Sequence, residues 1–251
     1  MSLVADLTGK SAFVTGGGSG VGAAIALALA DQGARVTICG RRSAPLNDVA
    51  GRASRITPVV CDITDEDAIS AAIAAADPDI VIANAGVSSS APFTKTNLND
   101  FERMVSINLT GTFLTLRESV RAMKDKPWGR MIAIASTAGL KGYAYVAPYA
   151  AAKHGVVGMV KSVALEYARK GITVNAICPG FLDTEMTDQS IANIVEKTGR
   201  TAAEARASLE ATNPMHKLVP PQDVAAAVLW LCSPGSDMVT GQAISVSGGE
   251  T

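Results

Sequence analysis

The sequence is poor in aromatic residues, in histidine and in excess charge of either sign. Phe, Trp and Tyr make up 4% of its 251 residues, although 48% of the residues are hydrophobic. A chain of this length buries roughly 72% of the surface that it exposes when extended, so its core needs no disulfide or structural metal. The composition excludes a disordered chain, a fibre and a disulfide scaffold.

The charges nearly cancel, with 22 basic and 23 acidic residues and no basic block. The chain therefore lacks the electrostatic signature of a nucleic-acid binder, and we expect a small-molecule partner and no nucleic acid. No stretch approaches the about 18 to 20 uninterrupted apolar residues of a membrane-spanning helix, and the N-terminus has no apolar signal segment. We expect a cytoplasmic protein with no membrane partner.

The chain offers few residues for metal binding or hydrolysis. It has two histidines, His154 and His216, so we predict no metal site, and no G-x-S-x-G elbow follows a strand as an α/β hydrolase would require. The cysteines form no C-x-x-C pair and lie in apolar stretches, which predicts buried, reduced thiols. They are Cys39, Cys61, Cys178 and Cys232.

Short apolar segments alternate with segments of helical periodicity along the chain. We expect strands at 11–15, 35–39, 57–61, 80–83, 130–136, 173–178 and 243–246. We expect helices at 65–76, 98–124, 148–170 and 221–232, and about two helical turns between 41 and 57. Strands that are apolar throughout are typical of a parallel sheet covered by helices on both faces. The pattern predicts an α/β, doubly wound fold with about seven parallel strands.

No repeat or linker divides the chain, so we expect residues 1–251 to form a single domain. Residues 183–220 are more polar and interrupt the alternation of strands and helices. Within them, Thr201 and Glu204 have the spacing of a capping box, which predicts a short helix that ends before Pro214. We expect an inserted pair of helices that forms a small lid over the strand ends.

A glycine-rich turn follows the first expected strand and reads T-G-G-G-S-G-V-G from Thr15 to Gly22. Such a turn lets a diphosphate approach backbone N–H groups at the positive end of a helix, although any sharp turn of this kind favours glycine. The second expected strand ends at Gly40 and is followed by Arg41 and Arg42. Arginines at this position favour NADP(H), whereas NAD(H) stays open if both are solvated loop charges.

Tyr149 and Lys153 are four residues apart and share one face of an expected helix. A free tyrosine has a pKa near 10, and we expect the nearby ammonium to lower this pKa towards the range for proton transfer. Ser136 ends the preceding expected strand, where its hydroxyl could hydrogen-bond a substrate carbonyl. The three residues together with the phosphate turn predict proton transfer at a carbonyl group.

These motifs resemble the short-chain dehydrogenase/reductase family over nearly the whole chain. The family's T-G-x-x-x-G-x-G turn matches 15–22, its adenine-contacting Asp resembles Asp62, and its N-N-A-G segment resembles 83–86 with Ala83 as a departure. Ser19 departs from the Arg of many NADP-using relatives, which leaves 2′-phosphate recognition mainly to Arg41 and Arg42. The resemblance implies a Rossmann fold and hydride transfer between NADP(H) and a carbonyl or secondary alcohol.

The resemblance also implies a catalytic tetrad. Tyr149 would donate the proton, Ser136 would hold the oxygen, Lys153 would bind the nicotinamide ribose, and Asn108 would hold a water that relays protons. The P-G-x-x-x-T stretch that holds the carboxamide matches 179–184. The residues implied to bind the cofactor are Gly16, Gly18, Ser19, Gly20, Val21, Gly22, Arg41, Arg42, Asp62, Ile63, Asn84, Ala85, Gly86, Tyr149, Lys153, Pro179, Gly180, Leu182 and Thr184.

The substrate is less well defined than the chemistry. Residues 183–220 and the closing V-S-G-G resemble ketoreductases of 3-oxoacyl thioesters and polyketides, so a 3-oxoacyl carrier substrate is the first expectation. The alternatives are an NAD(H)-dependent dehydrogenase of a sugar, polyol, steroid-like compound or cyclic alcohol, and a non-catalytic dinucleotide-binding regulator. The intact tetrad argues against the regulator. The resemblance implies a homotetramer, or a dimer.

Several residues of 183–220 are candidates for substrate contact. An apolar wall would use Met186, Ile191, Ile194 and Met215. An anionic substrate or carrier would meet Lys197, Arg200, Arg206 and Lys217. His216 could touch substrate, whereas we expect surface or packing roles for His154, Asp183 and Glu185.

Overall fold

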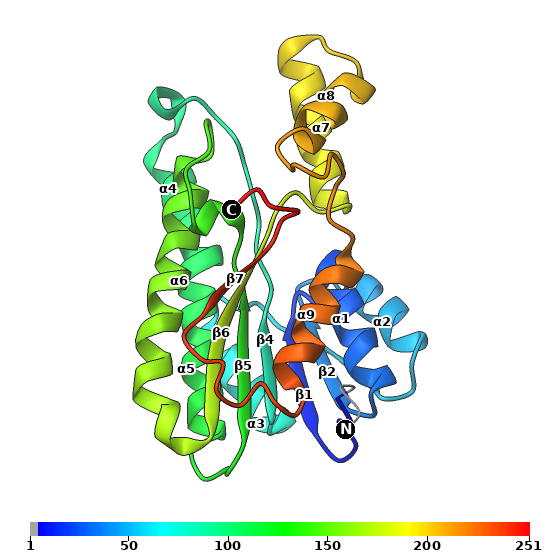
Figure 1. The fold of residues 1–251 in the computed structure, drawn as a ribbon, viewed down its shortest axis with the longest axis vertical. Coiled ribbons are helices and arrows are strands. Elements are labelled where there is room, and N and C mark those ends of the chain that lie inside the picture. The colour runs from blue at the N-terminus through cyan, green and yellow to red at the C-terminus, as the bar shows by residue number, and fades with distance from the viewer. Residues whose placement is uncertain (1–4) are drawn as a thin grey trace.

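The computed structural model describes residues 5–251, in which seven strands form one parallel sheet (Figure 1). The strands are β1 (Ser11–Thr15), β2 (Arg35–Gly40), β3 (Ile56–Val60), β4 (Ile80–Ala83), β5 (Gly129–Ile134), β6 (Ile172–Pro179) and β7 (Ala243–Val246). Their order in the sheet is β3-β2-β1-β4-β5-β6-β7. The predicted doubly wound α/β fold is confirmed, and the strand order reverses between β1 and β4, where such folds form their ligand crevice.

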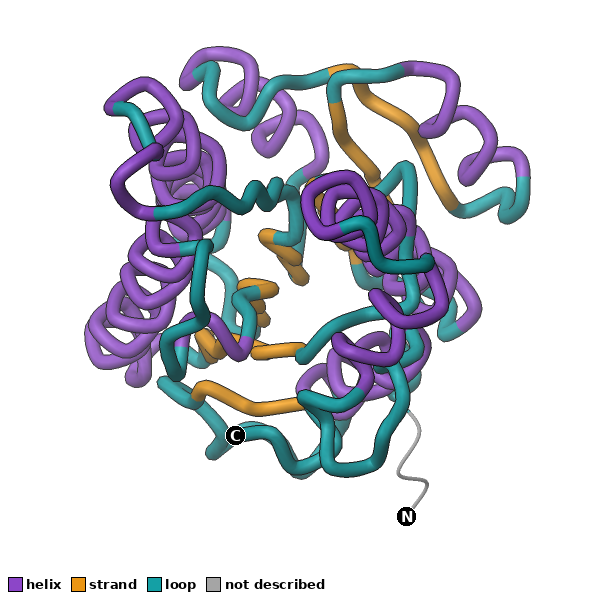
Figure 2. The backbone as a smooth tube through the Cα atoms, turned by 90° about the horizontal axis from the view of Figure 1, so that it is seen from above, coloured by secondary structure: helices purple, strands orange, loops and turns teal. Residues whose placement is uncertain are grey.

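Helices cover both faces of the sheet (Figures 1 and 2). One face carries α1 (Gly20–Asp31), α2 (Ser43–Gly51) and α9 (Pro221–Cys232). The other carries α3 (Glu66–Ala76), α4 (Leu98–Val105), α5 (Gly111–Ala122) and α6 (Ala147–Tyr167). The buried apolar core is made of aliphatic side chains, with the four cysteines, a few methionines and Phe13 among them. Small side chains let the helices approach the sheet closely, which explains the scarcity of aromatic residues.

The predicted strand ends differ from the observed ones by one or two residues. The largest difference is at β5, which ends at Ile134 and not at Ser136. The Ala135 N–H still donates to the Ile177 carbonyl, but Ser136 leaves the sheet and caps a 3-10 turn, where its Oγ accepts a hydrogen bond from Ala138 N at 3.1 Å. Ser136 therefore stands beyond the sheet edge.

The segment predicted as one helix over 98–124 contains an irregular turn. A π-helical turn, Ser106–Thr110, lies between α4 and α5. Asn108 Nδ2 donates to the Met104 carbonyl, and Thr112 Oγ1 donates to the Asn108 carbonyl, so side chains bond carbonyls of the helix here. Turns of this kind often occur at functional sites.

The predicted helical pair is present above the carboxyl ends of the strands (Figure 1). It consists of α7 (Glu185–Thr198) and α8 (Ala202–Glu210). The predicted capping box is formed, because Thr201 Oγ1 accepts from Glu204 N at 3.2 Å and Glu204 Oε2 accepts from Thr201 N at 2.9 Å. The pair has a small core of its own that includes Ile191 and Leu209. Within residues 5–251, no helix is long and apolar enough to cross a membrane.

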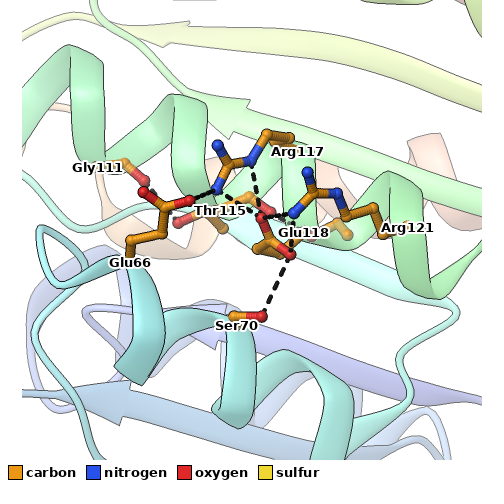
Figure 3. Close-up of polar contacts among 8 residues, drawn as sticks. Glu66, Ser70, Gly111, Thr115, Arg117, Glu118 and Arg121 are labelled. Atoms are coloured by element: carbon orange, nitrogen blue, oxygen red, sulfur yellow. Dashed lines mark hydrogen bonds and ion pairs between the residues drawn. The ribbon is translucent and has the colours of Figure 1, made fainter.

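Glu118 ties α5 to α3 through a buried carboxylate (Figure 3). Its side chain is 5% exposed, and its Oε1 accepts hydrogen bonds from Arg117 and Arg121, each at 2.8 Å. Ser70 of α3 donates to Oε2 at 3.3 Å, and Arg117 also reaches Glu66 at the start of α3. Burial acts to raise the pKa of Glu118, but the two arginines outweigh it and hold the pKa below its usual value.

Replacing Glu118 by Ala should lower the free energy of unfolding by about 1–3 kcal/mol at pH 7, because charge-assisted hydrogen bonds are lost. Since folding depresses this pKa, the contribution is present above the unfolded value of about 4.3 and is lost as the pH falls through the folded pKa. Urea unfolding of Glu118→Ala and wild type from pH 7 to pH 3 measures this.

The difference between the two proteins should narrow below about pH 4.5. Glu102→Ala, at an exposed position of α4, is the matched control and should change stability by less than about 0.5 kcal/mol. A difference between Glu118→Ala and wild type that stays constant over the whole pH range would contradict the proposed role of the carboxylate charge.

Candidate active site

A cleft of about 790 Å³ crosses the carboxyl ends of the strands and extends beneath the start of α7. Every residue predicted to bind the cofactor lines this cleft, as do the four predicted tetrad residues. They come from segments far apart in the sequence: the turns after β1 to β6, the start of α1, the π-helical turn and the first two turns of α6. The structure therefore brings the whole predicted set into one site.

The glycine turn after β1 forms one wall of this cleft. Gly16 and Gly20 have φ values of +65° and +51°, which residues other than glycine rarely adopt. A Cβ on Gly22 would lie 2.2 Å from the Gly16 carbonyl oxygen, so helix and turn touch directly. Ser19 does not cap α1 with its side chain, whereas Asp65 caps α3. The first N–H groups of α1 are thus left for an anion.

A hydrogen-bond brace fixes this turn against β4. Thr15 Oγ1 accepts hydrogen bonds from the N–H groups of Asn84 and Ala85 at 2.9 and 3.0 Å. The Asn84 side chain donates back to the Thr15 carbonyl at 2.9 Å. Ala83, the departure from the family's segment, is buried within β4 opposite Ala133. The departure leaves the brace intact.

Arg41, Arg42 and Asp62 lie at one end of the cleft, after β2 and β3. Both arginines are exposed, and neither forms an ion pair within residues 5–251. Asp62 accepts hydrogen bonds from Thr64 N at 3.0 Å and Thr64 Oγ1 at 2.8 Å. The bond from the Thr64 backbone is the main reason that the pKa of Asp62 is lowered, with a smaller contribution from Arg41. This end can bind a phosphate and a hydrogen-bond donor side by side.

Tyr149 and Lys153 stand on one face of α6, as predicted. The Lys153 Nζ donates to the Ile134 carbonyl at 2.9 Å and lies 5.6 Å from the centre of the Tyr149 ring. Burial lowers the pKa of Lys153 to about 8. Burial also raises the pKa of Tyr149, and the Ser136 side chain offsets this only in part. The predicted lowering of the tyrosine pKa is wrong for this arrangement, because desolvation dominates and the ammonium points to a carbonyl.

Asn108 is fully buried in the π-helical turn. Its Nδ2 donates to the carbonyls of Val87 and Met104, each at 3.0 Å, and its Oδ1 accepts from Val87 N at 3.2 Å. A Cβ on Gly86 would lie 2.7 Å from this Oδ1. The side chain therefore braces the segment after β4, which forms the floor of the cleft next to Lys153.

The predictions for residues 183–220 are only partly correct. Met186 lines the cleft, but Ile191, Ile194, Met215 and His216 are not among its lining residues. Ile191 and Ile194 instead pack in the small core of α7 and α8, because the pair must bury an apolar face of its own. Two of the four predicted cationic residues, Lys197 and Arg206, form contacts with other protein groups.

Two of these cations have partners in the structure. Arg206 pairs with Asp183 at 3.2 Å and with Glu210 at 2.9 Å, and Lys197 donates to the Ser90 carbonyl at 3.0 Å. His154 is exposed and contacts the Ala150 carbonyl of its own helix, as expected for a residue outside the site.

An aromatic corner of the cleft was missed by the sequence analysis. Tyr143 and Phe181 both line the cleft, with ring centres 6.1 Å apart and ring planes at 84°. Phe181 lies within the predicted 179–184 segment, directly after Gly180, and this position is the sequence signal for it. Tyr143 lies in the loop between Ser136 and Tyr149, where no periodicity marks the direction of a side chain.

Comparison with known proteins identifies the family. A family model described as enoyl-(acyl carrier protein) reductase matches residues 16–251. A 3-oxoacyl-(acyl-carrier-protein) reductase of Rickettsia prowazekii (strain Madrid E) is 36% identical over 246 residues, which cover 97% of this chain and 98% of the relative. The chain belongs to the short-chain dehydrogenase/reductase family. It is an NAD(P)-dependent oxidoreductase that acts on carbonyl or hydroxyl groups.

Two further relatives are polyketide enzymes. A putative ketoacyl reductase of the granaticin polyketide synthase of Streptomyces violaceoruber is 37% identical over 249 residues, covering 95% of this chain and 92% of the relative. A crystal structure of an actinorhodin polyketide ketoreductase variant with NADPH superposes with a TM-score of 0.93 at 34% identity. It covers 96% of this chain and 97% of the relative.

Replacing Gly22 by Ala should weaken NADPH binding by at least about tenfold, since the new Cβ would push the Gly16 carbonyl and shift the turn away from the diphosphate. Fluorescence titration with NADPH measures this. Gly51→Ala is the matched control, because a Cβ there meets nothing within 4 Å. The control should bind NADPH like wild type, and equal affinities for all three proteins would contradict the role of the turn.

Proposed function

We propose that the chain is an NADPH-dependent ketoreductase whose substrate is a 3-oxoacyl thioester. The observation that carries this proposal is the convergence of Ser136, Tyr149 and Lys153 with the glycine turn in one cleft. The names of the relatives, a 3-oxoacyl reductase and two polyketide ketoreductases, support the substrate class. The alternative of a dinucleotide-binding regulator would not require this set of side chains.

The residues of the cleft fit an NADP(H) molecule. The glycine turn at Gly22 and the N–H groups at the start of α1 can bind the diphosphate. The side chains of Arg41 and Arg42 can bind a 2′-phosphate. At the other end, Pro179, Gly180, Leu182 and Thr184 would hold the nicotinamide. The Thr184 methyl lies 3.4 Å from the position of a Cβ on Gly20, so the start of α7 reaches across the turn. When bound, the nicotinamide supplies the hydride.

The side chains supply the proton and hold the oxygen. Ser136 would donate a hydrogen bond to the carbonyl oxygen, and Tyr149 would transfer its phenolic proton to that oxygen. The usual pKa of tyrosine is about 10, and burial raises that of Tyr149 further, so the phenol is protonated at neutral pH and can donate. Lys153 would hold the nicotinamide ribose, stabilise the phenolate that forms, and, through its pKa of about 8, return a proton. Asn108 would hold a water that relays protons.

Further properties belong to the same proposal. Residues 1–251 would act as one domain, with 183–220 as a lid over bound substrate, in the cytoplasm. We infer a homotetramer, or a dimer, assembled through α4 to α6. Apolar side chains on the outer faces of α5 and α6, Phe113 at 41% and Leu165 at 83% exposure, support such an interface.

Replacing Tyr149 by Phe should lower kcat by about 10² to 10⁴-fold, because the proton donor is lost. NADPH affinity should change by less than about threefold, since the phenyl ring keeps the packing. Stopped-flow NADPH oxidation and fluorescence titration separate the two quantities. A variant with wild-type turnover would overturn the assignment.

Replacing Arg41 and Arg42 together by Ala should raise the Kd for NADPH by about 10 to 100-fold and leave the Kd for NADH within about twofold, because only NADPH has the 2′-phosphate. Arg52→Ala, at the exposed end of α2, is the matched control. The loss should diminish at high salt, as expected for a surface ion pair. A wild-type protein that prefers NADH tenfold would refute the NADP(H) preference.

A substrate panel tests the proposed class. The panel has four compounds, each assayed with both cofactors. Three are tested for reduction: a 3-oxohexanoyl thioester, the corresponding 2-enoyl thioester and cyclohexanone. A polyol is tested for oxidation. We expect the highest kcat/KM for the 3-oxoacyl thioester with NADPH. The enoyl thioester is included because the matching family model carries that description. Oxidation of the polyol with NAD that is faster than reduction of the 3-oxoacyl thioester with NADPH would favour an NAD(H)-dependent polyol dehydrogenase.

A further inference from the structure

Glu250, in the segment after β7, has a buried carboxylate that the proposed chemistry does not use. Its side chain is 1% exposed. Its Oε1 accepts a hydrogen bond from Tyr143 Oη at 2.5 Å and lies 3.1 Å from Lys141 Nζ. Its Oε2 is buried and has no hydrogen-bond partner within residues 5–251. A half-satisfied carboxylate is costly to bury, so packing alone does not explain it.

The carboxylate determines where the Tyr143 proton lies. Tyr143 Oη has two neighbours, Glu250 Oε1 at 2.5 Å and Thr137 Oγ1 at 2.6 Å. The phenol has one proton and a carboxylate can only accept, so Tyr143 donates to Glu250 and accepts from the Thr137 hydroxyl. The phenolic proton is therefore unavailable to a substrate. Thr137 directly follows Ser136, which links the network to the proposed oxygen-binding residue.

The same contacts fix the position of the Tyr143 ring in the cleft. Thr137, Tyr143 and Phe181 line the cleft, whereas Glu250 does not. The Lys141 ammonium lies 5.0 Å from the Tyr143 ring centre, which adds a cation–π contact. A Cβ on Gly180 would lie 3.2 Å from Glu250 Oε2. The carboxylate thus sits behind both walls, between the turn after Ser136 and the proposed nicotinamide loop.

We propose that Glu250 is a positioning residue that holds Tyr143 as an apolar wall of the substrate half of the cleft. The Tyr143 and Phe181 rings then select ketones in which the group beside the carbonyl is apolar and uncharged. A charged group placed there would lose its hydration and receive no hydrogen bond from Tyr143, because the phenolic proton is already bonded. This proposal rests on the proposed ketoreductase function and names the part of the substrate that the site recognises.

A double-mutant cycle tests the positioning role. Glu250→Ala should raise the KM for a 3-oxohexanoyl thioester about tenfold, with kcat within about threefold and NADPH affinity unchanged. Glu250→Gln, which keeps an acceptor oxygen, should restore most of the loss. In a Tyr143→Phe background, Glu250→Ala should add less than about twofold. Glu166→Ala, an exposed position of α6, is the control.

A matched pair of substrates tests the selectivity. The wild type should prefer the 3-oxohexanoyl thioester over the 3-oxoadipyl thioester, which ends in a carboxylate, by at least about tenfold in kcat/KM. Glu250→Ala should reduce that preference. Equal KM effects of Glu250→Ala with and without the Tyr143 hydroxyl, or no preference in the wild type, would overturn the proposal.

The contact between Glu250 and Tyr143 can also be measured without assaying enzyme activity. Burial and the bond to Glu250 raise the pKa of Tyr143 well above its usual value. Absorbance at about 295 nm should therefore show late tyrosine ionisation, and the part of it that is lost in Tyr143→Phe belongs to Tyr143, since burial also raises the pKa of Tyr149. Glu250→Ala should move this ionisation to lower pH. If the wild type reduces no ketone, the proposed function fails, while an unchanged titration in Glu250→Ala would refute the Glu250 contact itself.

Discussion

The site depends on the hydroxyl of Thr15, which joins the ends of β1 and β4, the two strands between which the strand order reverses. The Thr15 Oγ1 accepts hydrogen bonds from the N–H groups of Asn84 and Ala85, so the turn after β1 is held against the segment after β4. The glycine turn and the cleft floor both begin at this contact. Asn108 continues the brace from the floor to the π-helical turn through two bonds to Val87.

Desolvation is the main cause of the pKa shifts of Tyr149 and Lys153. Burial raises the pKa of Tyr149 and lowers that of Lys153 to about 8, so removal from water, and not the proximity of the two side chains, dominates both shifts. A raised pKa keeps the phenol protonated at neutral pH but also makes it a weaker acid. A similar arrangement recurs next to it, where Glu250 and burial keep Tyr143 neutral.

Much of the fold and of the cofactor half of the site was predictable from sequence. The strands are mainly apolar, α9 begins at a proline, and the glycine spacing predicts the turn. The substrate half was not predictable in the same way. Tyr143 contacts Glu250, 107 residues away in sequence, and Ile191 faces α8 instead of the cleft. Such directions depend on long-range contacts between loops, for which local periodicity carries no signal. The π-helical turn likewise depends on side-chain bonds within the helix.

The central claim is that this cleft transfers a hydride from NADPH to a ketone carbon, with its own side chains supplying the proton. The most direct measurement uses NADPH with deuterium at both C4 positions and a 3-oxohexanoyl thioester, with mass spectrometry of the product. We expect a 3-hydroxyacyl product that carries one deuterium at C3 and forms in step with NADPH oxidation. NADPH oxidation without deuterium at C3, or no product from any ketone, would contradict it.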